Sequence, residues 1–282
     1  MAVNLLGICN EFRQLLAQEK PDLARIALTI ARLEYPDMEP ARWLRRIDAI
    51  ADEIRARLPA GARKEERVAA INQYLFADMC YSDDSENYQD PRNSCLNAVL
   101  ERRLGIPLTL SLLYIEIAQR LGLDAHCLSF PGHFLVQINY DEARALVLDP
   151  INHGKVLAES DLRQLLAEVR GHADDPSIDL RELLVPASRR EILLRMLRNL
   201  KKIYVEAGNI DKAIASLSLV LITEPNAAVE MRERGLLYRE IEAYRAALAD
   251  LSSYLKLKPD AEDSEVVRHL VVELRAINAR FN

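Results

Sequence analysis

The amino-acid sequence predicts an α+β protein in which a mainly helical domain carries a small antiparallel sheet and an all-α region of helical repeats follows. Three observations predict it: helical apolar spacing over residues 22–78, β-type segments over residues 125–148, and a repeat near the C-terminus. The chain has 282 residues, half of them hydrophobic, enough for two modest cores. We expect the first domain at residues 1–180 and the repeat region at 189–282.

Proline positions and apolar spacing predict three helices in the N-terminal third. Asp22 can cap the first of them, and Pro36 ends it. Pro40 suits the first position of the second helix, where a backbone N–H would have no partner anyway. The third covers residues 64–78. The second helix has an apolar stripe at helical spacing that we expect to be buried: Trp43, Leu44, Ile47, Ile50, Ala51 and Ile54.

A polar and acidic stretch at residues 81–92 has no apolar period and predicts a loop. A short helix is expected to follow, capped by Asn93 or Ser94. Pro107 then begins a long helix that extends to Leu121 and is apolar on nearly every side. Such a pattern is typical of a helix buried at the centre of a domain.

After this helix the sequence changes to short segments rich in β-forming residues, at 125–130, 134–140 and 145–148. Polar or Pro-Gly turns separate them, so they predict an antiparallel meander. Residues 171–177 are polar and rich in turn formers, and we expect a linker from there to Ser188.

The C-terminal sequence repeats itself, since Pro225 and Pro259 are 259 − 225 = 34 residues apart. The same offset relates three further pairs: Ala213 with Ala247, Leu217 with Leu251, and Val220 with Tyr254. This is the period of the tetratricopeptide repeat. The second copy has Gly235 where that pattern expects glycine, whereas the first has Lys201. Two copies and an extra helix at 264–279 are fewer than an independent solenoid needs, so we expect the repeats to dock on the first domain.

The composition excludes several classes of function. A net charge of −6 disfavours a nucleic-acid-binding or membrane-surface protein, because those partners require a basic surface. The basic residues at 189–202 are expected to form the solvated face of a helix. The N-terminal residues do not resemble a signal peptide, and no apolar run is long enough for a membrane span.

The four cysteines are scattered and have no neighbours at zinc-ligand spacing: Cys9, Cys80, Cys95 and Cys127. We therefore expect a cytoplasmic protein without disulfides, metal or cofactor. The sequence leaves the oligomeric state open.

One combination of residues suggests catalytic ancestry. Cysteine hydrolases place a thiol at the N-terminus of a buried helix, where the helix dipole lowers its pKa, and complete the site with a histidine and an aspartate. Here a buried helix begins at Pro107, His133 follows a Pro-Gly turn, and Asp149 precedes Pro150. Because antiparallel strands return side by side, we predict that His133 and Asp149 form a hydrogen bond at the mouth of a cleft.

These residues resemble the transglutaminase-like (papain-like) core, in which a His-x-aromatic element and an Asp-Pro element follow the catalytic helix. A closer resemblance is to the SirB1 family, which joins this core to tetratricopeptide repeats. Three segments carry it: Asp-Pro-Arg-Asn-Ser-Cys-Leu-Asn at 90–97, Arg-Leu-Gly-Ile-Pro-Leu-Thr-Leu-Ser at 103–111, and Pro-Gly-His-Phe-Leu-Val at 131–136. The resemblance covers nearly the whole chain.

The sequence departs from the enzyme pattern where the nucleophile belongs. Counting back from Gly122 places the enzyme's cysteine at about Pro107, which has no nucleophile. Thr109 and Ser111 lie within one turn, although a hydroxyl needs stronger activation than a thiol. Cys95 is an alternative nucleophile at the start of the preceding helix, or else a small buried core residue.

The resemblance therefore implies a non-catalytic scaffold that binds a protein or peptide through its cleft and its repeats. The ligand-cleft candidates are Asn93, Ser94, Pro107 and Thr109, and the vestigial catalytic candidates are His133 and Asp149. The alternative is a hydrolase or acyltransferase acting on amide bonds, with Cys95 or Ser111 as nucleophile. A reactive thiol at Cys95 distinguishes the two.

Overall fold

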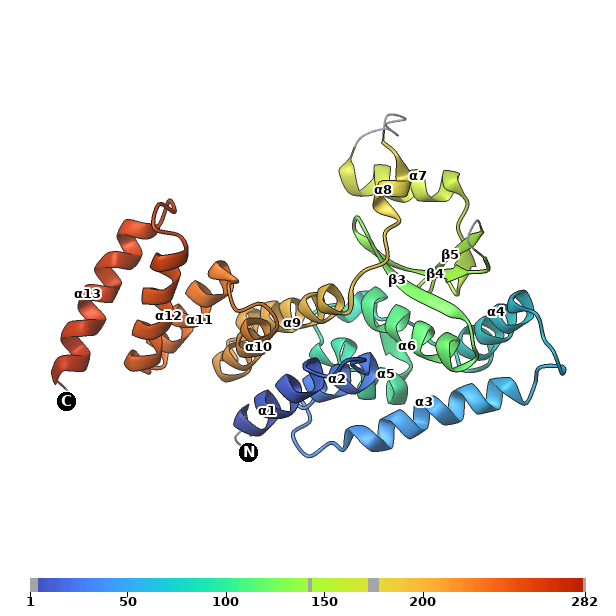
Figure 1. Cartoon of the computed structure of the whole chain (residues 1–282), viewed down its shortest axis with the longest axis horizontal. Coiled ribbons are helices and arrows are strands. Elements are labelled where there is room, and N and C mark those ends of the chain that lie inside the picture. Colours follow the sequence, from blue (N-terminus) through green and yellow to red (C-terminus); the bar gives the residue numbers. More distant parts are fainter. Residues whose placement is uncertain (1–4, 142–143, 172–177, 281–282) are drawn as a thin grey trace. The chain divides into compact units, whose positions relative to one another are not determined.

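The computed structural model describes residues 5–141, 144–171 and 178–280 and forms two compact units (Figure 1). One unit is Asp22–Leu193, and the other combines Met1–Pro21 with Leu194–Asn282. The predicted first domain began at residue 1, but helix α1 (Leu5–Leu16) packs on a repeat helix, α10 (Ile210–Thr223). The expected docking of the repeats on the first domain stays a prediction.

The helices of the Asp22–Leu193 unit begin where the sequence predicts. Asp22 accepts a hydrogen bond from the N–H of Arg25 and caps α2 (Leu23–Ala31). Pro40 begins α3 (Pro40–Arg55), and α4 (Lys64–Asn72) continues into a π-helical turn, η1 (Gln73–Asp78). The stripe of α3 is buried from Ile47 onward, whereas Trp43 and Leu44 at its first turns are only partly buried. The buried position predicted for Trp43 is therefore wrong.

The long helix α6 (Pro107–Arg120) is the centre of this unit, as predicted. Its side chains from Leu108 to Ala118 are buried. It contacts α2, α3, α4 and α5 (Leu96–Arg102), and it packs on two strands of the sheet. All-round burial explains why this helix has no polar face.

The predicted antiparallel meander is confirmed. The sheet consists of β3 (Asp124–Phe130), β4 (His133–Asn139), β5 (Ala145–Asp149) and β6 (Lys155–Val156), in that order. Neighbouring strands are antiparallel throughout.

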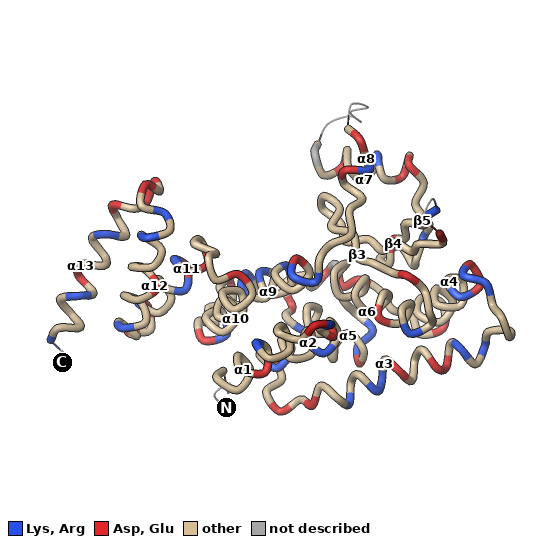
Figure 2. Tube along the Cα trace, in the orientation of Figure 1, with Lys and Arg blue, Asp and Glu red and all other residues tan. Residues whose placement is uncertain are grey.

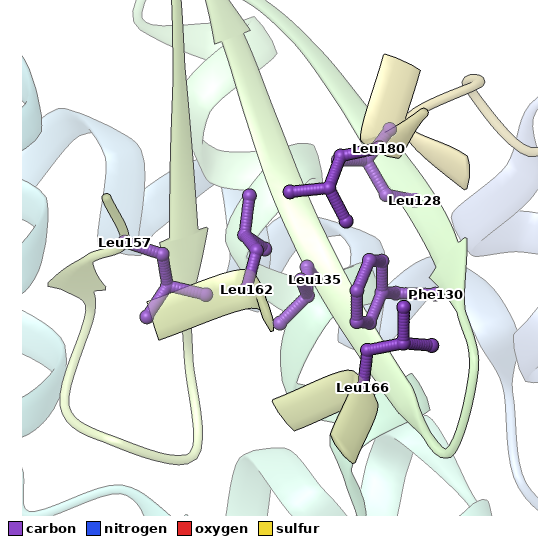
Figure 3. Close-up of a cluster of buried hydrophobic side chains, with 7 residues drawn as sticks. All are labelled: Leu128, Phe130, Leu135, Leu157, Leu162, Leu166 and Leu180. Atoms are coloured by element: carbon purple, nitrogen blue, oxygen red, sulfur yellow. The ribbon is translucent and has the colours of Figure 1, made fainter. Parts of the chain in front are cut away.

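One face of the sheet carries a cluster of apolar side chains under α7 (Glu159–Arg170) and α8 (Leu180–Leu183), shown in Figure 3. Its buried members are Leu128, Phe130, Leu135, Leu157, Leu162, Leu166 and Leu180. No described residue of α6 belongs to this cluster, although α6 packs on β3 and β4. Helix α6 therefore covers the opposite face.

Several short elements were not predicted. The stretch expected to be a loop contains β1 (Ser82–Asp83), which pairs in parallel with β2 (Leu104–Gly105), and two 3₁₀ turns, η2 (Ser85–Asn87) and η3 (Pro91–Ser94). Helix α8 lies within the predicted linker, of which residues 172–177 are outside the described part of the chain. All of these elements are too short to give a periodic sequence signal.

The repeat helices follow the 34-residue offset. Helices α9 (Arg189–Glu206) and α10 form the first pair, α11 (Ala228–Glu240) and α12 (Tyr244–Leu257) form the second, and α13 (Ser264–Arg280) follows. The offset pairs are buried, with Ala213, Ala247, Leu217 and Leu251 all at 0% exposure.

Among the described residues, no helix combines the length and apolarity needed to cross a membrane.

Candidate functional site

The N-terminus of α6, where an enzyme of this fold carries its thiol, presents Pro107 as the first helical residue. Two residues on, Thr109 is fully buried and its hydroxyl is already bonded. Its Oγ1 donates to the carbonyl oxygen of Asn93 at 2.7 Å and accepts from the N–H of Ile106 at 3.1 Å. Thr109, the third residue of α6, thus bonds back to the backbone of the N-cap residue, Ile106, and holds the preceding turn against the helix.

Ser111 is also fully buried, one half-turn further along α6. Its Oγ donates to the backbone carbonyl of Phe134 at 2.8 Å and so ties the helix to β4. A hydroxyl that donates to a carbonyl has no general base to remove its proton, so this geometry does not activate Ser111.

Asp149 is buried, but its carboxylate serves the turn that follows β5. One oxygen accepts from the N–H of Ile151 at 3.1 Å, and the other accepts from the Nδ2 of Asn152 at 2.5 Å. His133 forms no hydrogen bond with Asp149, so the predicted pair is not made. Leu148 pairs with Val136, so Asp149 lies opposite Leu135 and is offset by two residues from His133, and both of its oxygens already bond to the following turn.

Strand alternation also places His133 away from α6. Residues 133 and 135 point to the same face, and Leu135 belongs to the cluster under α7. His133 is partly exposed next to the β3–β4 turn. His133 therefore does not face Pro107, Thr109 or Ser111 at the start of α6.

Cys95 is fully buried immediately before α5, and its surroundings are apolar. It clusters with Ala31 and Ala98, and Tyr35 and Met38 pack against that cluster. No histidine takes part, and His133 makes no hydrogen bond to Cys95. These contacts agree with a small core residue, the second of the two interpretations.

The ligand-cleft candidates are mostly inside the protein. Asn93, Ser94 and Thr109 are at most 1% exposed, and Pro107 is partly exposed. Asn93 and Thr109 belong to a buried polar network instead, whereas the buried Oγ of Ser94 has no hydrogen-bond partner among the described residues. Asn93 donates through Nδ2 to Asp84 at 3.1 Å and to the carbonyl of Asn87 at 2.9 Å, while its Oδ1 accepts from Arg102 at 2.9 Å.

Arg102 closes this network with a second bond to Asp84, at 3.1 Å. The pKa of Asp84 lies below its ordinary value, because Asn87 donates to the carboxylate, as do Asn93 and Arg102. Sequence analysis did not single out Asp84 or Arg102. One sequence feature could have indicated them: the polar stretch that contains Asp84 has no apolar period and precedes a helix that ends in Arg102 and Arg103.

The repeats form a second candidate site, a groove of about 290 Å³ between α9, α10 and α11. Its apolar lining includes Val205 and Leu236, which are 46% and 39% exposed. Lys201 and Glu233 form an ion pair of 2.9 Å beside it. Residues of these types in a shallow groove suit an amphipathic peptide.

Comparison with known proteins agrees with this architecture. The model of the Transglutaminase-like superfamily matches residues 41–198, and that of the Tetratricopeptide repeat matches residues 200–271. A UPF0162 protein of Xylella fastidiosa (strain Temecula1) is 38% identical over 252 residues, 89% of each chain.

The chain belongs to the SirB1/UPF0162 family of transglutaminase-like proteins.

Two other relatives extend the comparison. UPF0162 protein PA3419 of Pseudomonas aeruginosa is 33% identical, covering 87% of this chain and 88% of its own. Protein SirB1 of Salmonella typhimurium is 26% identical, covering 86% and 88%. In this SirB1-family chain, the segments at 90–97 and 103–111 that carry the resemblance build the polar network and the start of α6.

Among the described residues, no group of three or more histidine, cysteine or acidic side chains could hold a metal ion.

Proposed function

We propose that this SirB1-family chain is a non-catalytic scaffold that binds a protein or peptide segment. The observation that carries the proposal is the start of α6, where Pro107 stands in place of a nucleophile and the hydroxyls of Thr109 and Ser111 are bonded to backbone carbonyls. A thiol or hydroxyl hydrolase needs a nucleophile beside a base, and the burial of Cys95 among apolar groups argues against that alternative.

The groove between α9 and α11 supports the binding role. Tetratricopeptide repeats mediate protein interactions in general, and here the groove exposes Val205 and Leu236 beside paired charges. An amphipathic segment can bury these two side chains and still meet the charged rim. The scaffold is proposed to act in the cytoplasm, a reducing compartment that suits four scattered cysteines that form no disulfide.

A matched pair of leucines tests the proposal. Leu236 in the groove is 39% exposed, and Leu257 at the end of α12 is 40% exposed. Affinity capture with the full chain, followed by mass spectrometry, should recover a partner that is lost with Leu236→Glu and retained with Leu257→Glu. Circular dichroism should show that both variants keep their helices. If no captured protein distinguishes the two variants, the groove is not the binding site and the scaffold proposal loses its support.

A further inference from the structure

A hollow of about 410 Å³ lies between α3 and α5, within the transglutaminase-like unit and apart from the repeat groove. It is lined by Arg42, Arg45 and Arg46 from α3, and by Leu100 and Glu101 from α5. Trp43, the single tryptophan of the chain, also lines it. This is the side chain whose predicted burial proved wrong.

The arginines of this hollow are available to a partner. Arg45 is exposed, and its side chain makes no hydrogen bond or ion pair with any described residue. The guanidinium of Arg42 lies 5.5 Å from the centre of the Trp43 ring. Arg46 has a long contact of 3.5 Å with Glu53. The three guanidinium groups are therefore only weakly neutralised.

The charge of this hollow differs from that of the chain. The protein has a net charge of −6, but of the described residues lining the hollow only Glu101 is acidic. Figure 2 shows basic residues interspersed with acidic ones along α3. The acidic residue of α3 that follows the arginines, Asp48, bonds to Arg120 at 2.6 Å and so does not neutralise them.

Placing arginines in the first turns of a helix also opposes the helix dipole, whose positive end lies there. The first turn of α3 has no acidic residue, and the N-cap residue before it, Glu39, makes no capping hydrogen bond through its side chain. Residues 40–47, the first half of α3, therefore carry three arginines and no acidic side chain, a charge that an acidic partner would offset.

We propose that this hollow is a docking surface for an acidic protein segment with an apolar anchor residue. The anchor would pack on Trp43 and Leu100, and carboxylates on either side would bind Arg42, Arg45 and Arg46. Tryptophan and arginine are the residues that contribute most to protein interfaces. A simple inorganic anion would use the guanidinium groups and leave the apolar floor in water. The acidic chain as a whole disfavours a nucleic acid or an anionic membrane.

The single tryptophan makes its fluorescence a local probe of this site. We would titrate the full chain with a blocked peptide that alternates glutamate and leucine, and with matched peptides that replace glutamate by lysine or leucine by serine. The glutamate–leucine peptide should change the Trp43 emission saturably and bind at least about tenfold more tightly than either matched peptide.

The double variant Arg42→Gln/Arg45→Gln should weaken binding of this peptide about tenfold. Arg189→Gln/Arg195→Gln, which removes two exposed arginines of α9, changes the net charge equally and should leave the affinity unchanged. Trp43→Ala, followed by calorimetry and checked by circular dichroism, should also weaken binding about tenfold. The groove variant Leu236→Glu should bind normally, so this test is independent of the proposed function.

An unchanged emission, an equal response to the lysine peptide, or equal losses in the two double variants would overturn the proposal. A tighter response to a single-stranded oligonucleotide or to vesicles of anionic lipid would overturn it in favour of those ligands.

Discussion

Thr109 accepts from the N–H of Ile106 and donates to the carbonyl of Asn93, and so joins the start of α6 to the polar network. Gly105 leaves room for this contact, since a Cβ there would lie 2.9 Å from the Thr109 Oγ1 and 3.2 Å from Val99. The residues that look like an altered active site in sequence thus have a structural role.

The network predicts how stability depends on pH. Asp84 has a pKa below its ordinary value of 3.8, so its contribution to stability is present above about pH 4 and is lost as pH falls through the lowered pKa. Asp84→Asn should destabilise the protein by about 2 kcal/mol at pH 7, because an amide nitrogen would face other donors. The variant should also lose less stability than the wild type between about pH 4 and pH 2. Urea unfolding at several pH values measures both effects. If the free energy of unfolding fell equally for the wild type and the variant between about pH 4 and pH 2, Asp84 would not be the group responsible.

Backbone conformation distinguishes two equivalent positions of the repeats. Gly208 has φ 68° between α9 and α10, and Glu242, 34 residues later, has φ 60° between α11 and α12. A residue with a Cβ is strained in this left-handed region, whereas glycine is not.

Glu242→Gly should therefore stabilise the repeats by about 0.5–1 kcal/mol, although glycine is usually destabilising. Gly208→Ala is the matched reverse change and should destabilise them by a similar amount. Thermal unfolding followed by circular dichroism checks the pair. A loss of stability in both variants would mean that the strain at Glu242 is compensated elsewhere.

At the scale of elements, the distance between paired helices depends on small residues. In the second repeat, a Cβ on Gly235 of α11 would lie 2.8 Å from the side chain of Leu251 on α12. The first repeat has Lys201 at the equivalent position, so only the second pair relies on glycine for this approach.

Gly235→Ala should destabilise the repeats by about 1–2 kcal/mol, because overpacking outweighs the better helix propensity of alanine. Glu240→Ala on the exposed side of α11 is the control and should change stability by less than about 0.5 kcal/mol. Equal midpoints of urea unfolding for the wild type and Gly235→Ala would contradict this prediction, because they would show that Leu251 can move aside without loss of stability.

The long elements were predictable because their patterns are periodic, and the short ones were not. The all-apolar α6, the meander and the 34-residue offset each left a clear signal in sequence. The pair β1–β2 has two residues in each strand and is held by a polar network, which periodicity does not detect. The orientation of His133 depended on register, since a shift of one residue reverses the face to which a side chain points.

At the scale of the whole molecule, the two units carry separate candidate surfaces. The repeats expose the groove beside Leu236, and the transglutaminase-like unit exposes the hollow beside Trp43. A scaffold with two surfaces of different chemistry can bind two segments of one partner or two partners. With independent partners, Leu236→Glu and Arg42→Gln/Arg45→Gln should each weaken binding only of the partner that uses the altered surface. With one partner that uses both surfaces, the combined variant should weaken its binding by about the sum of the two separate free-energy losses.

The absence of a nucleophile is the central claim, and the reactivity of Cys95 tests it most directly. In the variant Cys9→Ser/Cys80→Ser the remaining thiols, Cys95 and Cys127, are both buried. Burial also raises the pKa of Cys127, which keeps it as a thiol. The measurement is the rate of alkylation by iodoacetamide as a function of pH, with the modified residue located by mass spectrometry. We predict no alkylation of Cys95 in the native state at pH 7 and full alkylation after unfolding in urea. Rapid alkylation of native Cys95, with an apparent pKa below about 7 that His133→Ala raises, would contradict the account and identify a thiol enzyme.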